Sequence, residues 1–347
     1  MNSNLTSPSR SHGLICGDLE PGSRNLITDV SGVSVGHHTV IEGNLRTGFT
    51  AVWPHQGNLF REKLPAAVEV INGFGKSAGL MQVEELGTLE SPILLTNTFG
   101  VGTGVNALVR RELAENPEID RSAGTVNTLV MECNDGYLSD INALALSEDD
   151  AFSALKTASD NFGQGSVGAG TGTSCFGFKG GIGSASRVFD LDGSAYTLGA
   201  LVQSNFGRAG DLVLPDGRRP SPEAARQTEE RGSVIIVLAM DVPLESRQLK
   251  RVAKRAAAGL ARLGAYYGNG SGDVALAFST AQRLAHFQES DFVALDVLKE
   301  DRIDVLFKAA TETTQEAVLN SMIASPAMTG RSGNHRPSLA DWLAANR

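Results

Sequence analysis

Residue types that build disulfide frameworks and metal sites are scarce in this sequence. Three cysteines occur in 347 residues, Cys16, Cys133 and Cys175, and their scattered pattern and odd number fit reduced thiols better than disulfides. The six histidines show no zinc-binding spacing, and the adjacent pair His37 and His38 would point to opposite faces of a strand. We therefore expect no metal site, and any chemistry must run without an obvious histidine base.

Long apolar runs and an excess of positive charge are also missing. No run approaches the ~20 residues of a membrane span, and the first residues lack the order of a signal peptide. The net charge is −9 and no basic stripe is visible, which argues against nucleic-acid binding. We expect a cytoplasmic protein that binds neither nucleic acid nor a membrane.

Glycine is abundant, with 39 residues that follow no fixed period. Such residues usually serve tight turns, close packing or the approach of backbone to a ligand. They are dense in residues 161–186, which predicts a long, shaped loop; we call this the glycine-rich segment. Residues 1–24 are polar, and we expect them to be poorly ordered. Residues 211–231 are polar and contain three prolines, which is typical of a surface linker.

Apolar and helical patterns alternate along the rest of the chain, which predicts an α/β fold in layers. Short apolar runs predict buried strands at residues 68–71, 93–95, 128–131 and 234–240. Helical patterns lie at residues 107–113, 150–160, 244–263 and 304–323. For the helix expected at 244–263, Asp241 and Pro243 supply a start signal and Gly264 a stop signal.

Short motifs give weak signals. Gly75, Ser77 and Gly79 match the G-x-S-x-G pattern of a nucleophile elbow, but a packing turn is the favoured interpretation in a glycine-rich chain. The same region fails as a phosphate loop, because Val70 stands where a glycine is required. Residues 102–107 follow a predicted strand and resemble a dinucleotide-binding turn, but the acidic residue expected about 20 positions later is missing. Tight packing of helix on strand is favoured there, and nucleotide binding stays open.

The pair Gly232 and Ser233 joins the polar linker to the most apolar predicted strand. A serine hydroxyl can attack the preceding carbonyl, and hydrolysis of the resulting ester would release Ser233 with a free α-amino group. This amine has a reference pKa of about 7.7–8.0, so it can accept a proton near neutrality. Taken alone, a Gly-Ser pair means little, because the sequence contains several.

Longer blocks around this pair carry a resemblance. They lie at residues 71–76 (INGFGK), 82–90 (QVEELGTLE), 92–98 (PILLTNT), 132–138 (ECNDGYL), 202–207 (VQSNFG), 231–237 (RGSVIIV), 247–251 (RQLKR), 268–273 (GNGSGD) and 328–331 (MTGR). In these blocks the chain resembles the family of L-aminopeptidase/D-esterase-amidases and β-peptidyl aminopeptidases. The resemblance leaves out only the first two dozen residues and the extreme C-terminus.

The resemblance implies an αββα sandwich, with two stacked sheets between helical layers. It implies one catalytic domain over residues 1–347, cut between Gly232 and Ser233 into chains 1–232 and 233–347 that stay associated. A homotetramer of processed protomers without metal or organic cofactor is expected from the same resemblance.

Four residues match catalytic positions of the family. The nucleophile maps onto Ser233, a second serine and its acidic partner onto Ser271 and Asp273, and the oxyanion-hole asparagine onto Asn205. Ser271 and Asp273 would share one face of an extended segment, and a donor such as Asn205 contributes roughly 3 kcal/mol elsewhere.

Two further residues match positions near the substrate, Glu132 to hold its ammonium group and Tyr137 beside it. The alternatives are that Glu132 pairs with an arginine and that Tyr137 only packs.

The sequence therefore predicts a self-cleaving serine aminopeptidase or amidase acting through an acyl-enzyme on Ser233. Its expected partner is a small peptide or an amino-acid amide or ester. L-amino-acid amides, D-alanyl esters or amides, and β-peptides all remain open as substrates. Two alternatives are an acyltransferase similar to the ornithine acetyltransferases, which use threonine where this chain has Ser233, and a nucleotide-binding protein that uses residues 102–107.

Overall fold

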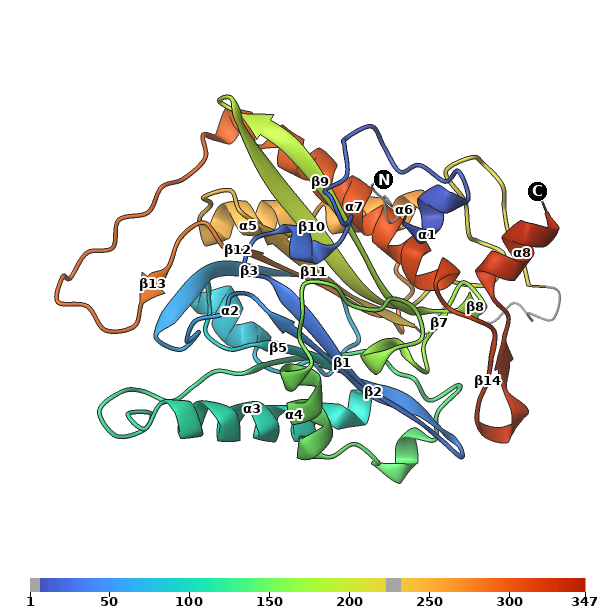
Figure 1. The fold of residues 1–347 in the computed structure, drawn as a ribbon, viewed down its shortest axis with the longest axis horizontal. Coiled ribbons are helices and arrows are strands. Elements are labelled where there is room, and N and C mark those ends of the chain that lie inside the picture. Colours follow the sequence, from blue (N-terminus) through green and yellow to red (C-terminus); the bar gives the residue numbers. More distant parts are fainter. Residues whose placement is uncertain (1–6, 223–231, 347) are drawn as a thin grey trace, which may run out of the picture.

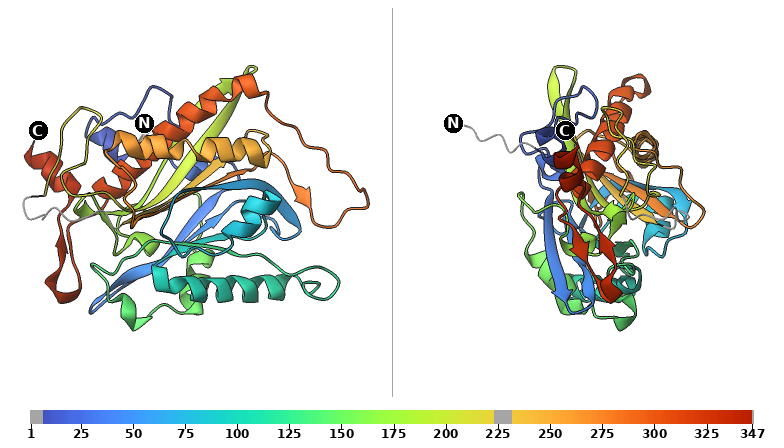
Figure 2. Two further views of the ribbon diagram at one scale, coloured as in Figure 1. Left: turned by 180° about the vertical axis from the view of Figure 1, so that it is seen from behind. Right: turned by 90° about the vertical axis from the view of Figure 1, so that its right-hand side faces the viewer.

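Two stacked β-sheets lie between two layers of helices in the computed structural model of this chain, which describes residues 7–222 and 232–346 (Figure 1). Figure 2 shows the same order of layers from behind, with Val101–Glu115 on one side of the sheets and Asp304–Ile323 on the other. The predicted αββα sandwich is confirmed.

The smaller sheet has four strands in the order β1-β2-β5-β6. Their bounds are Ser34–Glu42 for β1, Leu45–Trp53 for β2, Ile93–Thr96 for β5 and Leu129–Glu132 for β6. Two helices, α3 (Val101–Glu115) and α4 (Glu148–Lys156), cover its outer face. Leu108 and Leu155 of these helices pack with Phe49 and Leu94 of the sheet in one buried cluster, so the apolar stripe of each helix is buried against the strands.

The larger sheet has the order β13-β3-β12-β11-β10-β9, with β4 paired to β3. The bounds are Leu284–Ala285 (β13), Glu62–Gly73 (β3), Gly272–Ser279 (β12), Ser233–Met240 (β11), Ser194–Asn205 (β10), Gly181–Leu191 (β9) and Thr88–Leu89 (β4). Its outer face is covered by α5 (Ser246–Ala253), α6 (Ala256–Arg262) and α7 (Asp304–Ile323) (Figure 1).

Shorter elements complete the fold. They are α1 (Pro8–Ser11), α2 (Leu80–Leu86), β7 (Ser174–Cys175), β8 (Phe178–Lys179), β14 (Met328–Thr329), β15 (His335–Arg336) and α8 (Leu339–Ala345). Single 3₁₀ turns lie at Ile27–Asp29, Thr98–Gly100, Ile141–Ala143, Gly168–Gly170, Glu300–Arg302 and Arg331–Gly333. Of the described helices, none has the length and apolar character needed to cross a bilayer.

Strand β11 is buried on both faces, which explains its uninterrupted apolar run. Ile235 and Val237 belong to the core between the two sheets, whereas Ile236 and Leu238 belong to the core beneath α5, α6 and α7. Alternate side chains of a strand point to opposite faces, so each step along β11 fills the other core. A strand held in this way cannot shift its register by one residue without exchanging the two sets.

The predicted elements are largely present. Each of the four expected strands lies within or overlaps an observed one, and the helix expected at residues 304–323 has the bounds of α7. The helix expected at residues 244–263 is instead two helices, α5 and α6, that meet at Lys254 and Arg255. Gly264 ends the second with a φ of +99°, in the left-handed region that favours glycine. At Gly259 a Cβ atom would lie 2.5 Å from the carbonyl oxygen of Thr311, so α6 packs directly on α7.

Two glycines of the weak motifs serve packing. A Cβ atom on Gly104 would lie 3.0 Å from Val130, at the contact of α3 with β6. Gly79 has a φ of +91°, and a Cβ atom there would lie 2.2 Å from the carbonyl oxygen of Thr128. These contacts agree with the packing interpretations favoured for both motifs.

Two expectations about loops are wrong in part. The glycine-rich segment is not all loop, because it contains the hairpin β7–β8 and the first residues of β9. A Cβ atom on Gly183 of β9 would lie 2.0 Å from the carbonyl oxygen of Ala317, so the glycine at this position allows α7 to pack closely on β9. Of the polar start, residues 7–24 are placed against the body, with Ser9 and Leu14 buried; residues 1–6 lie outside the described residues, as does 223–231 of the predicted linker.

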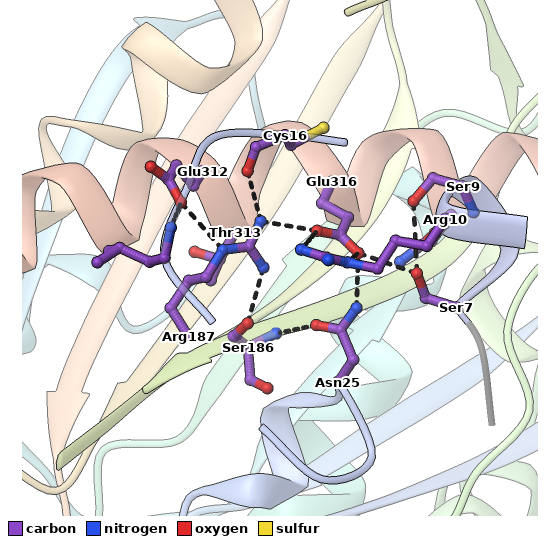
Figure 3. A network of polar contacts seen from close by, with 12 residues as sticks. Ser7, Ser9, Arg10, Cys16, Asn25, Ser186, Arg187, Glu312, Thr313 and Glu316 are labelled. Atoms are coloured by element: carbon purple, nitrogen blue, oxygen red, sulfur yellow. Dashed lines mark hydrogen bonds and ion pairs between the residues drawn. The ribbon is translucent and has the colours of Figure 1, made fainter. Parts of the chain in front are cut away.

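A buried network of charges explains why the polar start is ordered (Figure 3). Arg187 of β9 is fully buried and donates hydrogen bonds to Glu312 (3.1 Å) and Glu316 (2.7 Å) of α7. Arg10 donates to Glu316 at 2.9 Å, and the Asn25 amide donates to it at 2.6 Å. Burial opposes the charge on Glu316, but Arg187 and Arg10 outweigh it and hold the pKa of this carboxyl below its usual value.

We predict that Arg187→Met lowers the stability of the protein by about 3 kcal/mol or more, because it leaves buried carboxylates without their main partner. The measurement is the midpoint of thermal unfolding. Arg302→Met is the matched control, since Arg302 is half exposed and lies 3.9 Å from an exposed Asp192; it should leave the midpoint unchanged. Equal midpoints for the two variants would contradict the role given to Arg187.

Candidate active site

The ends of three strands of the larger sheet meet at one place. Asn205 is the last residue of β10 and lies opposite Ser233, the first residue of β11. On the other side, Ser233 lies beside Gly272, the first residue of β12. Three residues from separate parts of the sequence are therefore neighbours because of strand register alone.

Ser233 is buried, with 4% of its surface exposed, and its hydroxyl faces the core between the sheets. Within residues 7–222 and 232–346, its Oγ makes no regular hydrogen bond. The thiol of Cys133 lies beside it: burial raises the pKa of this thiol well above its usual value, and contact with Ser233 opposes that rise. Cys133 therefore stays protonated, and the hydroxyl of Ser233 is not tied to a fixed acceptor.

Gly232 places its carbonyl next to this hydroxyl. The N–H of Gly272 donates a hydrogen bond of 3.1 Å to the Gly232 carbonyl oxygen. A Cβ atom on Gly232 would lie 2.2 Å from the carbonyl oxygen of Asn205, so no larger residue fits without movement. The bond between Gly232 and Ser233 thus has an unhindered carbonyl, polarised by one backbone donor.

The side chain of Asn205 is fixed at both ends. Its Oδ1 accepts a hydrogen bond of 2.9 Å from the N–H of Ser174, and its Nδ2 donates one of 2.9 Å to the carbonyl oxygen of Asn134. A primary amide carries two N–H donors, so this arrangement uses one of them. The amide has a set orientation beside Ser233, as the donor of an oxyanion hole requires.

Ser271 and Asp273 form a buried pair, as their spacing predicted. The Ser271 hydroxyl donates to Asp273 Oδ1 at 2.6 Å, and both residues are almost fully buried. Asp273 also raises the pKa of the Cys133 thiol, so its negative charge acts on the groups around Ser233.

Glu132 ends β6 and is buried, with 3% of its surface exposed. Its carboxylate accepts hydrogen bonds from the N–H of Lys76 (2.9 Å) and from the Thr98 hydroxyl. These two neutral donors, rather than an arginine, are its partners in the described part of the chain. Among the described residues, no ion pair gives Glu132 a cationic partner.

Tyr137 lies further out than the other predicted residues. Its side chain is 41% exposed, and the guanidinium of Arg336 lies 3.6 Å above the centre of its ring. The Asn334 amide donates to the Tyr137 carbonyl oxygen at 2.8 Å. These contacts join Tyr137 to the hairpin β14–β15, which agrees with the packing alternative.

Several groups of the site were not singled out from the sequence. They are the N–H of Gly272, the Cys133 thiol, the donors Lys76 and Thr98 on Glu132, and the two groups that hold Asn205. Most act through backbone atoms, which a residue pattern does not reveal. The sequence did contain one signal that could have pointed to some of these groups, because Cys133, Asn134 and Gly272 lie inside the blocks that carry the family resemblance. No group of three or more metal-binding side chains occurs among residues 7–222 and 232–346.

Comparisons with known proteins agree with this geometry. The model of peptidase family S58 matches residues 25–336. β-Peptidyl aminopeptidase BapA of Sphingosinicella microcystinivorans is 38% identical over 341 residues, which cover 90% of this chain and 85% of that protein.

Solved structures give the same answer. The PH0078 protein of Pyrococcus horikoshii OT3 has a TM-score of 0.90 and 45% identity, with 97% of each chain covered. The L-aminopeptidase D-Ala-esterase/amidase of Ochrobactrum anthropi, described as a variant of the Ntn hydrolase fold, has a TM-score of 0.88 and 34% identity over 97% of each chain. The chain therefore belongs to peptidase family S58 and is a self-processing serine aminopeptidase of that family.

Proposed function

We propose that this chain cuts itself between Gly232 and Ser233 and that Ser233 is then the N-terminal nucleophile. One observation supports this proposal most directly. At the ends of β10, β11 and β12, Ser233 and the Gly232 carbonyl lie beside the Gly272 N–H and the Asn205 amide. The products are chains 1–232 and 233–347 of one catalytic unit.

In the cut, Ser233 Oγ attacks the Gly232 carbonyl carbon, and the C–N bond of the peptide breaks. The hydroxyl proton passes to the departing nitrogen, which leaves an ester and a free α-amino group on Ser233. The Gly272 N–H stabilises the negative charge that develops on the Gly232 oxygen. Water then hydrolyses the ester and releases Gly232 as a carboxylate.

The new amino group is the base of the mature enzyme. Its reference pKa of about 7.7–8.0 lets it take the proton of Ser233 Oγ as this atom attacks the substrate carbonyl. Asn205 and the Gly272 N–H hold the oxyanion, and the leaving group takes the proton. Asp273, hydrogen-bonded to Ser271, stabilises the positive charge that the amine carries in between. Water then attacks the ester of the acyl-enzyme. The amine takes a proton from this water and returns it to Ser233 Oγ, and the acyl group leaves as a carboxylic acid.

We propose that Glu132 selects substrates with a free amino group. Its buried carboxylate has no partner cation among the described ion pairs, and a substrate ammonium would supply the missing charge by charge-assisted hydrogen bonds. The substrates are then small peptides and amino-acid amides or esters with an unblocked amine. The names of the relatives, a β-peptidyl aminopeptidase and an L-aminopeptidase D-Ala-esterase/amidase, fit this class.

We also propose a cytoplasmic homotetramer of processed protomers. The segment around β13 extends away from the body, and it exposes Phe292 (85%), Val293 and Val297 to solvent (Figure 1). Association would cover such apolar side chains. Native mass spectrometry should give a particle of about four times 36.5 kDa; a mass near one protomer would reject the assembly.

We predict that Ser233→Ala gives one uncut, inactive chain of 347 residues, whereas the unchanged protein gives chains 1–232 and 233–347. The measurement is intact mass under denaturing conditions together with hydrolysis of an amino-acid p-nitroanilide. Ser77→Ala is the matched control, because Ser77 is the serine of the G-x-S-x-G pattern; it should be cut and active. A cut and active Ser233→Ala protein would overturn the assignment.

We predict that Glu132→Gln lowers kcat/KM for a free-amine substrate about 10-fold to 100-fold. A hydrogen bond to a charged group contributes roughly 1.5–3 kcal/mol, and the amide keeps the shape of the carboxylate without its charge. The measurement compares an amino-acid p-nitroanilide with its N-acetylated form, and the preference for the free amine should shrink. Glu84→Gln, which alters an exposed carboxylate paired with Lys250, should preserve the preference.

A further inference from the structure

The segment that follows β3 lies between two parts of the proposed site. The N–H of Phe74 donates a hydrogen bond of 3.2 Å to the carbonyl oxygen of Ser271, just before β12. Two residues later, the N–H of Lys76 donates one of 2.9 Å to the carboxylate of Glu132. Gly75 is the residue between these two hydrogen bonds. Its backbone is therefore held between the start of β12 and the carboxylate proposed to bind the substrate's ammonium group.

A Cβ atom on Gly75 would mark a point close to both parts of the site. It would lie 3.7 Å from Glu132 Oε1 and 3.8 Å from the Cα atom of Gly272. Within residues 7–222 and 232–346, no other atom outside the neighbouring residues of the chain lies within 4 Å of this point. Gly75 is itself exposed. The space beside it is thus open to solvent and bordered by two groups of the site.

Neither the backbone nor the packing of the fold requires glycine at position 75. Its φ lies outside the left-handed region, and the two distances are those of ordinary van der Waals contact. Gly232 and Gly272 differ, because a Cβ atom on them would lie 2.2 Å and 2.9 Å from a carbonyl oxygen. Glycine also allows a ligand to approach the backbone closely. We therefore look to a ligand for the reason that position 75 has no side chain.

In the proposed reaction, the N-terminal residue of the substrate occupies this space. Its ammonium group lies at Glu132, and its carbonyl oxygen lies at the N–H of Gly272 while Ser233 attacks. In an α-amino acid, one carbon atom joins these two groups and also carries the side chain. Glu132 and Ser233 are buried, so the exposed Gly75 lies on the open side of the space that this carbon would enter.

We propose that Gly75 is a specificity-determining residue, whose missing side chain leaves room for the side chain of the substrate's N-terminal residue. This inference rests on the roles proposed for Ser233 and Glu132. The substrates concerned are peptides, amides and esters whose N-terminal residue is larger than glycine. A methyl group at position 75 would take up space that such a side chain needs, whereas an N-terminal glycine would still fit.

The test compares Gly75→Ala with the unchanged protein on two substrates, the p-nitroanilides of glycine and of leucine. We expect the unchanged protein to hydrolyse both. In Gly75→Ala, kcat/KM for the leucine compound relative to the glycine compound should fall about 10-fold or more, because one methylene group in a fitted pocket changes kcat/KM by about 10-fold to 200-fold. An unchanged ratio, including an equal loss for both substrates, would overturn the inference.

Intact mass and thermal unfolding show whether the alanine acts in another way. Because a Cβ atom on Gly75 meets only ordinary contacts, Gly75→Ala should be cut normally and unfold at the midpoint of the unchanged protein or slightly above it. An uncut chain or a lower midpoint would also overturn the inference, since the glycine would then serve cutting or packing.

Gly124→Ala is the matched control. Gly124 lies on the loop between α3 and β6, and a Cβ atom there would meet no described atom within 4 Å. This variant makes the same substitution away from the proposed site, so it should keep the ratio of the two substrates. A fall in the ratio as large as that of Gly75→Ala would show that the effect does not depend on the space beside Glu132, and would overturn the inference.

The unchanged protein distinguishes failure of this inference from failure of the proposed function. If it stays uncut, or is cut and hydrolyses neither p-nitroanilide, the proposed function itself is wrong. If it is cut and hydrolyses the glycine compound alone, or if Gly75→Ala keeps the ratio of the two substrates, the roles of Ser233 and Glu132 stand and only the inference about Gly75 is overturned.

Discussion

The hydrogen bond from the Gly272 N–H to the Gly232 carbonyl depends on the pairing of β11 with β12, and the rest of the site depends on the position of β11. The pairing of β11 with β10 sets Ser233 opposite Asn205. The register cannot drift, because β11 fills one core with odd-numbered and another with even-numbered side chains. Two hydrophobic cores thus fix the position of Ser233 at their edge.

The same arrangement would keep the two products of the proposed cut together. Chain 233–347 would contribute β11, β12 and β13 to the larger sheet, while β3, β9 and β10 stay with chain 1–232. Strands β11 and β12 lie between β10 and β3, so separation would break ladders on both sides. The buried bonds of Arg187 to Glu312 and Glu316 cross the same division, so the proposed cut would free a terminus without releasing a chain.

Local patterns predicted the regular elements well, because burial decides them. Helix α7 and strand β11 follow from apolar spacing that needs no knowledge of neighbours. The loop expected at residues 161–186 was wrong in part, because Gly183 lies in a strand where it allows close contact with α7. The expectation of a poorly ordered start was wrong in part as well, because Arg10 bonds to Glu316, which lies about 300 residues away in the sequence. For the site, the resemblance supplied Ser233 and Asn205, but the Ser174 N–H and the Asn134 carbonyl that hold Asn205 are long-range backbone contacts that no sequence spacing encodes.

In the proposed mechanism the base is the α-amino group of Ser233, so the two reactions of the site have different catalytic groups. Before the cut, the nitrogen of Ser233 is an amide, which is not a base near neutrality, so the first reaction must rely on strand geometry and the Gly272 donor. After the cut, the same nitrogen is an amine that accepts the hydroxyl proton. Every substrate turnover thus has a catalytic group that the first reaction lacked. The first cut should therefore be the slower event, and hydrolytic power arises only in a chain that has already folded well enough to cut itself.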